Sequence, residues 1–321
     1  LPAEPDYAVY GMLPTALGWT MQNNIYMGWR MATGDVDGDT YCDLVVSSIE
    51  YNGSDGAVFL YLGSADGLQS SPVEGWVNDQ NGSGTETFGR RVAVGDVNDD
   101  GMDDILIGAR TFDNPAVSGS NQGAAFLFLG KSYDFEPEAS SFTLASEADW
   151  TVIGESSSDL HGAWVDVGDM DGDGVEDVVV GAPQEELSGH PGNSGSVHIY
   201  LGIPSELPST TATYLVGGEN ATDLFGQLVV ALGDVEGDGL PDMLVVAARH
   251  DAYGHSPGTP IYISGDTEVA WQNLEHEGEP AGQWLGWSAA FVGDWDNDGY
   301  DDLAVGAPKQ DHHATSENGG S

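Results

Sequence analysis

The stretch GDVDGDTYCDLVVSS, residues 34–48, places four carboxylates within nine residues and then runs into an apolar segment. The carboxylates are those of Asp35, Asp37, Asp39 and Asp43. Four such groups at close quarters repel one another unless a cation lies among them. The apolar run DLVVSS is typical of a strand buried on both faces. The stretch therefore predicts a cation-binding loop that leads directly into a buried strand.

The same pattern occurs five times along the 321 residues. Its copies begin at Gly34, Gly95, Gly168, Gly233 and Gly293, with spacings of 61, 73, 65 and 60 residues. A fixed period of this kind is the signature of a repeat architecture. The repeated stretches span residues 34–48, 95–109, 168–183, 233–248 and 293–308.

Each repeat predicts four antiparallel strands. A glycine-centred turn such as FGRRVAV, from Phe88, precedes a short alternating apolar run. The acidic loop and the second, buried strand follow, and a third strand such as GAAFLFLG, from Gly123, comes next. The remaining 20–30 residues or so leave room for one outer strand. No 3.6-residue apolar period lasts three turns, so we expect an all-β chain, a single β-propeller domain over residues 1–321 with about five four-stranded blades.

The glycine turn, the Asp-rich loop and the GAP ending resemble the FG-GAP repeats of integrin α-subunit-type propellers, which also occur in bacterial secreted proteins. The resemblance covers essentially the whole chain. It implies a propeller that binds Ca²⁺ through the acidic loops and that acts as an adhesion or assembly module.

The loop chemistry also indicates Ca²⁺ on its own. Side-chain oxygens at loop positions 1, 3, 5 and 9 and the carbonyl at position 7 form the oxygen set that Ca²⁺ prefers, whereas Mg²⁺ rarely uses such all-protein cages. Transition metals would call for His or Cys, which no loop supplies as a ligand. We expect about five Ca²⁺ sites. Their ligands would be Asp35, Asp37, Asp39, Tyr41 and Asp43; Asp96, Asn98, Asp100, Met102 and Asp104; Asp169, Asp171, Asp173, Val175 and Asp177; Asp234, Glu236, Asp238, Leu240 and Asp242; and Asp294, Asp296, Asp298, Tyr300 and Asp302.

Loop position 6 holds glycine in four repeats, and glycine adopts the positive φ of a tight chelating turn. Thr40 takes this place in the first loop, so we expect that site to be the weakest. Cys42, the only cysteine, excludes an intrachain disulfide, and we expect its side chain to point into the blade.

The two ends of the chain together have the length of one repeat. DYAVYGML, residues 6–13, reads as a third strand ahead of the first glycine turn, and the last repeat ends without its outer strands. We expect the last blade to be shared between the N-terminal and C-terminal segments. Exchange of the N-terminal strand between subunits, which would build a homopolymer or filament, is one alternative. A fragment of a seven-bladed propeller is the other.

The charge balance excludes several partners. With 53 acidic and 7 basic residues the formal net charge is −46, which repels nucleic acid and anionic membranes. No apolar run is long enough to insert into a membrane as a helix, and the first residues lack a signal-peptide pattern. We expect a soluble, secreted or cell-surface protein whose export signal has been removed. Three sequons, at Asn52, Asn81 and Asn220, would suit N-glycosylation.

The leading functional hypothesis is an extracellular, calcium-stabilised scaffold for adhesion, protein interaction or self-assembly. No catalytic constellation stands outside the repeats, so we do not expect an enzyme. The polar segments 249–255 and 311–313 are interpreted as loops. A lectin-like propeller with a glycan ligand is one alternative, drawn from nine Trp and twelve Tyr residues, although Trp29, Trp164 and Trp287 are expected to pack in the repeat cores. A non-catalytic domain of a secreted hydrolase is the other alternative.

Overall fold

The computed structural model of the chain describes residues 12–15, 18–21, 27–51, 55–78, 88–116, 118–133, 142–190, 192–218, 221, 223–231, 234, 242–247, 259–263, 272–273 and 288–306. These residues form sheets that are antiparallel apart from one parallel pair of strands, together with the short 3₁₀ helix η2 (Ala145–Glu147). No helix among them is both long and apolar enough to cross a membrane. The all-β prediction is confirmed.

Four successive sheets have the expected meander, in which each strand pairs with the next strand of its own blade. Blade 1 contains β3 (Met27–Gly34), β4 (Asp43–Ser48), β5 (Ala57–Tyr61) and β6 (Glu74–Val77), with β10 (Thr143–Leu144) added in parallel to β6. Blade 2 contains β7 (Phe88–Gly95), β8 (Asp104–Ala109), β9 (Ala124–Phe128) and β11 (Trp150–Ile153). Blade 3 contains β12 (Trp164–Gly168), β13 (Asp177–Ala182), β14 (Ser196–Tyr200) and β15 (Tyr214–Gly217). Blade 4 contains β16 (Leu228–Ala231), β17 (Met243–Ala247), β18 (Thr259–Ile263) and β19 (Gln272–Asn273).

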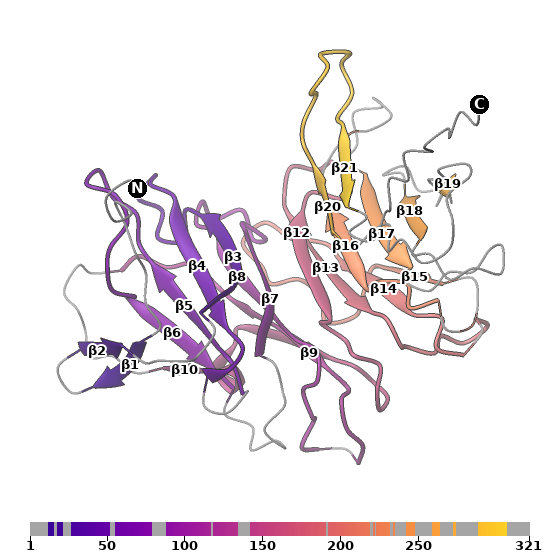
Figure 1. Cartoon of the computed structure of the whole chain (residues 1–321), viewed down its shortest axis with the longest axis horizontal. Helices are drawn as coiled ribbons and strands as arrows, with labels where there is room; N and C mark the ends of the chain where they lie inside the picture. Colours follow the sequence, from indigo (N-terminus) through magenta and orange to yellow (C-terminus); the bar gives the residue numbers. More distant parts are fainter. Residues whose placement is uncertain are drawn as a thin grey trace, which may run out of the picture.

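The first strands of the blades lie next to one another. Strand β7 contacts both β3 and β12, and β16 contacts both β12 and β20 (Ser288–Phe291). Figure 1 shows the sheets following one another in sequence order, with these first strands facing the middle of the molecule. The arrangement is that of propeller blades, each of which packs its faces against the blades beside it.

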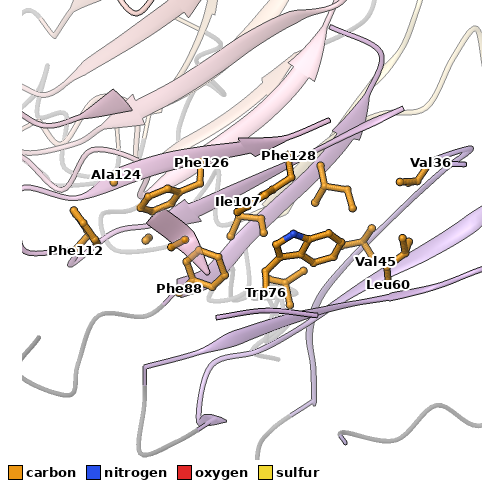
Figure 2. Packing of buried hydrophobic residues seen from close by; sticks show 14 of the residues in the cluster. Val36, Val45, Leu60, Trp76, Phe88, Ile107, Phe112, Ala124, Phe126 and Phe128 are labelled. Carbon is orange, nitrogen blue, oxygen red and sulfur yellow. The ribbon is translucent and has the colours of Figure 1, made fainter. Parts of the chain in front are cut away.

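The cores lie between blades because the second strand of each blade is apolar on both faces. Strands β8 and β13 are buried at every residue. Between blades 1 and 2, Val45 and Leu60 lie opposite Ile107 and Phe126, with Trp76 among them (Figure 2). Two further clusters fill the spaces between blades 2 and 3 and between blades 3 and 4. Burial of each large apolar side chain contributes about 1.5–3 kcal/mol to folding.

The two ends of the chain do not pair with each other in the described residues. Strand β1 (Met12–Thr15) forms a hairpin with β2 (Gly18–Met21), and β20 (Ser288–Phe291) pairs with β21 (Leu303–Gly306) in a separate two-stranded sheet. Most of the expected N-terminal strand, residues 6–11, lies outside the described part. Sharing of the last blade therefore stays a prediction.

Two expectations about single side chains are corrected. Trp29 is 38% exposed and is not core packing, whereas Trp164 packs partly buried against the cluster between blades 3 and 4. Cys42 is exposed and does not point into the blade. It stands directly before buried Asp43, and alternation along the chain turns it to the opposite side. Trp287 lies outside the described residues.

Candidate metal centre

The acidic loops connect the first and second strands of their blades. They join β3 to β4, β7 to β8, β12 to β13 and β20 to β21. In the fourth repeat the described loop residues are Asp234 and Asp242; Glu236, Asp238 and Leu240 lie outside the described part, as do the sequons at Asn52, Asn81 and Asn220. The segments 249–255 and 311–313 lie outside it as well.

The carboxylate at position 1 closes each described loop into a tight coil. Its Oδ2 atom accepts a hydrogen bond from the backbone N–H of position 6. The donors are Thr40 at 2.8 Å, Gly101 at 2.8 Å, Gly174 at 2.9 Å and Gly299 at 3.0 Å. The same bond therefore forms whether position 6 is glycine or threonine.

Position 6 has positive φ in all four of these loops. The values are 76° for Thr40, 86° for Gly101, 93° for Gly174 and 99° for Gly299. Threonine keeps the fold of the first loop in a conformation that is strained for a β-branched residue. Position 4 also has positive φ, which the repeat pattern does not predict. Its residues are Gly38, Asp99, Gly172 and Asn297, types that tolerate this conformation.

The carboxylate at position 9 ties the loop to the sheet. Asp43 is buried; its Oδ2 accepts the N–H of Val36 at 2.9 Å and its Oδ1 that of Gly63, at the end of the third strand, at 2.8 Å. Asp104 and Asp177 make the equivalent pairs of bonds, with Val97 and Gly130 and with Met170 and Gly202. Asp302 accepts the N–H of Trp295 at 2.8 Å. One side chain thus joins the loop to the second and third strands.

Burial makes these position 9 carboxylates costly to charge. It raises the pKa of Asp43 to about 6 and the pKa of Asp104 and Asp177 to about 7, although backbone hydrogen bonds lower each pKa in part. The charges of neighbouring loop carboxylates contribute to these raised pKa values. A cation among these groups would favour their charged form.

Three loops bring carboxylate oxygens within 4.8 Å of one another. The groups are Asp35, Asp37 and Asp39; Asp169, Asp171 and Asp177; and Asp294, Asp296 and Asp302. The second loop has Asn98 at position 3, and its amide nitrogen donates to Asp100 Oδ2 at 3.1 Å. Position 3 of the second loop is therefore an amide, whereas each of the three loops with a cluster has a carboxylate there.

The donor set fits a hard divalent cation. It is made of oxygen atoms, and Oδ1 of Asp35 is buried without a hydrogen-bond partner. Such an atom gains most from a cation, because an unpaired buried oxygen is costly. The residues that would hold the ion are the side chains at positions 1, 3, 5 and 9 and the carbonyl at position 7. The ion would cancel the repulsion among the carboxylates.

The loops also contact one another through position 8, a feature that the repeat pattern alone does not reveal. Asp103 Oδ2 accepts the N–H of Asp35 at 2.7 Å, and the N–H of Asp103 donates to the carbonyl of Asp35 at 2.9 Å. Asp301 makes the same two bonds with Asp234, at 3.1 and 3.0 Å. Glu176 lies correspondingly against Gly95 and Asp96, and a Cβ on Gly95 would overlap its carboxylate.

Blade 3 contains one further polar cluster, which was not predicted from the sequence. His198 Nε2 lies 2.5 Å from Glu185 Oε2 and 3.2 Å from Ser196 Oγ, and Ser196 donates to the same Glu185 oxygen. Both partners meet the same ring nitrogen, so His198 does not bridge Ser196 and Glu185 as the base of a nucleophilic triad does. The signal was available: His161 and His198 stand where blade 2 has Phe88 and Phe126.

Comparisons with known proteins agree with this architecture. The family described as FG-GAP repeat matches residues 88–128, 161–200 and 285–321. Integrin alpha-5 of Xenopus laevis is 27% identical over 263 residues, covering 80% of this chain and 23% of the relative. Integrin alpha pat-2 of Caenorhabditis elegans is 30% identical over 250 residues, 75% of this chain and 19% of the relative. Integrin alpha-IIb of Homo sapiens is 28% identical over 228 residues, which cover 69% of this chain and 20% of the relative.

The chain is thus an all-β repeat protein built from propeller blades. More specifically, it carries FG-GAP repeats and is similar to integrin α subunits. It spans about a fifth to a quarter of the length of these relatives.

Proposed function

We propose that this chain is an extracellular, calcium-stabilised propeller scaffold that presents a protein-binding surface for adhesion. The observation that carries the proposal is the clustering of carboxylates in three loops at equivalent places in three blades. The likeness to integrin α subunits supports a role in adhesion.

The proposed role of the cation follows from the loop geometry. Bound Ca²⁺ would neutralise the carboxylates at positions 1, 3, 5 and 9, and position 9 is already bonded to the second and third strands. Fixing this side chain would stiffen the inner half of the blade. We propose one site per loop, about five in all, with the second site altered by Asn98.

The proposal is tested by the melting temperature in excess Ca²⁺ and in excess EGTA. A single site at about 100 times its dissociation constant adds roughly 2.7 kcal/mol to the free energy of unfolding. We expect a clear increase in Ca²⁺ and a smaller increase in the Asp171→Ala variant. Glu186→Gln, which removes an exposed carboxylate outside the loops, is the matched control. Identical melting curves in Ca²⁺ and EGTA would refute the proposed metal role.

The same measurement tests the strain in the first loop. Thr40→Gly is expected to raise stability by about 1 kcal/mol, since a non-glycine residue in this conformation costs about 1–3 kcal/mol. The Ca²⁺-dependent increase should remain. A loss of stability in this variant would show that the threonine side chain contributes contacts that outweigh the strain.

A glycan ligand is the second candidate, and one observation favours it. Trp295, at position 2 of the last loop, is 79% exposed, whereas the residues at position 2 in the first three loops are buried. Exposed indole rings are suited to stacking on sugar faces. A glycan array probed with and without chelator, and with Trp295→Ala, tests this candidate.

Self-assembly through the N-terminal segment is a separate proposal. The last sheet has two described strands, and an unpaired sheet edge accepts a further strand. Deleting residues 1–15 should unfold a ring closed within one chain, or abolish polymers if the strand is exchanged between chains. An unchanged melting temperature and particle size would refute both forms.

A further inference from the structure

Four of the seven basic residues lie together, although the chain has a formal net charge of −46. Arg30 lies in β3, Arg90 and Arg91 lie in β7, and Arg110 directly follows β8 (Figure 1). We call these four residues the arginine cluster. Burial, and then the charges of the other three arginines, lower the pKa of Arg91 to about 9. The cluster is therefore close enough to be electrostatically costly.

No carboxylate offsets this cost within the described residues. The two ion pairs found there are Lys131 with Glu74 and His198 with Glu185, and neither involves the cluster. The Nε atoms of Arg91 and Arg110 are buried without a hydrogen-bond partner. A buried donor without an acceptor costs about 1–3 kcal/mol. An anion would satisfy both the charges and these donors.

Two tryptophan rings contact three of the four guanidinium groups. The Cζ atoms of Arg30 and Arg90 lie 5.7 and 5.9 Å from the ring centroid of Trp29, and Cζ of Arg91 lies 3.7 Å from that of Trp164. Each guanidinium carries five N–H donors. Arg30 and Arg91 each donate one hydrogen bond to the carbonyl of the residue before it. Most donors of these groups are thus left for a ligand.

The backbone directs these side chains away from the regular pleat. The pairing of β3 with β4 and of β7 with β8 shifts register at Met27–Met31 and at Phe88–Arg91. Irregularities of this kind re-aim side chains and are common next to functional sites. Arg30, Arg90 and Arg91 lie in the first halves of β3 and β7, and both strands end at acidic loops, so the cluster is separated along the strands from the carboxylates.

We propose that the arginine cluster binds a single carboxylate group, presented by an acidic side chain of a protein partner. A guanidinium fork matches a carboxylate with two parallel hydrogen bonds. Net charge decides between this partner and a polyanion such as a sulfated polysaccharide. An extended polyanion would be repelled by the remaining surface, whereas one carboxylate on a weakly charged partner meets only the cluster. Arginine and tryptophan are also the residue types enriched where protein interfaces bind most strongly.

This inference rests on the proposed scaffold function and adds the chemistry of the partner. Its probe is a capped pentapeptide, Ala-Ala-Glu-Ala-Ala, compared with Ala-Ala-Gln-Ala-Ala, on the intact calcium-loaded chain. Binding is followed through the arginine Nε–Hε signals in nuclear magnetic resonance spectra. We expect the Glu peptide to shift the signals of Arg91 and Arg110 and to bind at least tenfold more tightly than the Gln peptide.

Variants separate the cluster from general charge effects. Arg110→Gln and Arg30→Gln should each weaken binding of the Glu peptide severalfold. Arg91→Lys, which keeps the charge but loses the fork, serves where Arg91→Gln disturbs packing on Trp164. Lys131→Gln removes a cation that is already paired with Glu74 and should leave binding unchanged.

Three results would overturn the proposal. The first is equal affinity for the Glu and Gln peptides. The second is tighter binding of a sulfated oligosaccharide than of the Glu peptide, which would assign the cluster to a polyanion. The third is binding of the Glu peptide that is unchanged in both Arg110→Gln and Arg30→Gln. Melting in Ca²⁺ and EGTA is measured on the same samples, so a failure of the metal role is seen separately.

Discussion

In blade 2 the ring of Phe126 lies between those of Phe88 and Phe112, with centroids 5.7 and 5.4 Å away (Figure 2). Blade 3 fills the equivalent places with ionisable groups. His198 contacts the ring of His161, with centroids 4.7 Å apart, and its Nε2 lies 2.5 Å from Glu185. At two neighbouring places, Ser196 of blade 3 stands where blade 2 has Ala124, and Tyr200 stands where blade 2 has Phe128.

The difference teaches that this fold accepts a polar core when the replacements come as a set. Glu185, Ser196 and His198 bond to one another, and the Tyr200 hydroxyl lies 3.4 Å from Nε2 of His161. A buried polar group that lacks some of its hydrogen bonds would make the core less stable than phenylalanine does. The Nδ1 atom of His161 is the exception, because it is buried without a partner. At these core positions blade 3 therefore has titratable side chains, whereas blade 2 has none.

The largest expected effect comes from placing one member of the polar set in blade 2. Phe126→His should lower the free energy of unfolding by about 3–5 kcal/mol, because it removes apolar contacts and buries an imidazole without a partner. Denaturant unfolding in excess Ca²⁺ measures the loss. If polar replacements work as a set, Phe112→Glu with Phe126→His should lose less than the sum of the two single variants. If the losses of the two single variants add up to that of the double variant, the polar replacements do not act as a set.

A smaller effect is expected from uncoupling the pair in blade 3. Burial raises the pKa of Glu185, but the hydrogen bond and charge of His198 outweigh it and lower the pKa overall. Glu185→Gln should therefore cost about 1.5–3 kcal/mol, as expected for a hydrogen bond to a charged group. Glu186→Gln, at the exposed neighbouring position, should change unfolding by less than about 0.5 kcal/mol. Equal effects of the two variants would show that the buried pair contributes nothing.

The pH dependence should differ between wild type and His161→Phe. Burial, and then the charge of His198, lower the pKa of His161 to about 3, against about 6.5 in an unfolded chain. Between these values the folded protein binds fewer protons, so stability falls as the pH falls below about 6.5, by up to about 1.4 kcal/mol per unit.

His161→Phe, which introduces the residue type that blade 2 has at Phe88, should remove this slope between pH 7 and 5 in saturating Ca²⁺. The loop carboxylates are common to both proteins, so the difference between the two curves isolates the histidine. Parallel curves would mean that His161 is protonated in the folded protein.

The smallest effect is expected for the exchange of alanine and serine. Ser196→Ala should cost about 1 kcal/mol through the lost hydrogen bond to Glu185. Ala124→Ser in blade 2 should cost a similar amount for the opposite reason, because the hydroxyl would be buried among phenylalanines. A stabilising effect of either change would contradict the hypothesis that these polar residues are favourable only as a set.

The repeat pattern predicted the blades because loop, buried strand and third strand recur at fixed offsets. It also predicted positive φ at position 6, although Thr40 adopts this φ as well, since the hydrogen bond from its N–H to Asp35 holds the loop closed. Spacing alone did not reveal the positive φ at position 4, because Asp99 and Asn297 stand there in two loops.

Contacts between blades could not be predicted from one repeat at a time. An acid at position 8 is visible in the sequence, but its partner is 68 residues away in the preceding loop. The exposure of Trp29 and the grouping of the four arginines likewise depend on how β3 and β7 lie side by side. The polar set of blade 3 could have been found by aligning the repeats, since each change replaces a residue at the same offset.

The position 8 contacts all point in one direction, from the side chain of a later blade to the backbone of an earlier one. During synthesis the earlier blade leaves the ribosome first, and chains fold from the N-terminus as they emerge. Asp103 and Asp301 therefore each meet a docking site that has already been made, so each new blade is positioned by the one before it. The fourth loop has Pro241 at this place and no carboxylate. The step between blades 3 and 4 would thus rely on the apolar cluster between them rather than on a position 8 carboxylate.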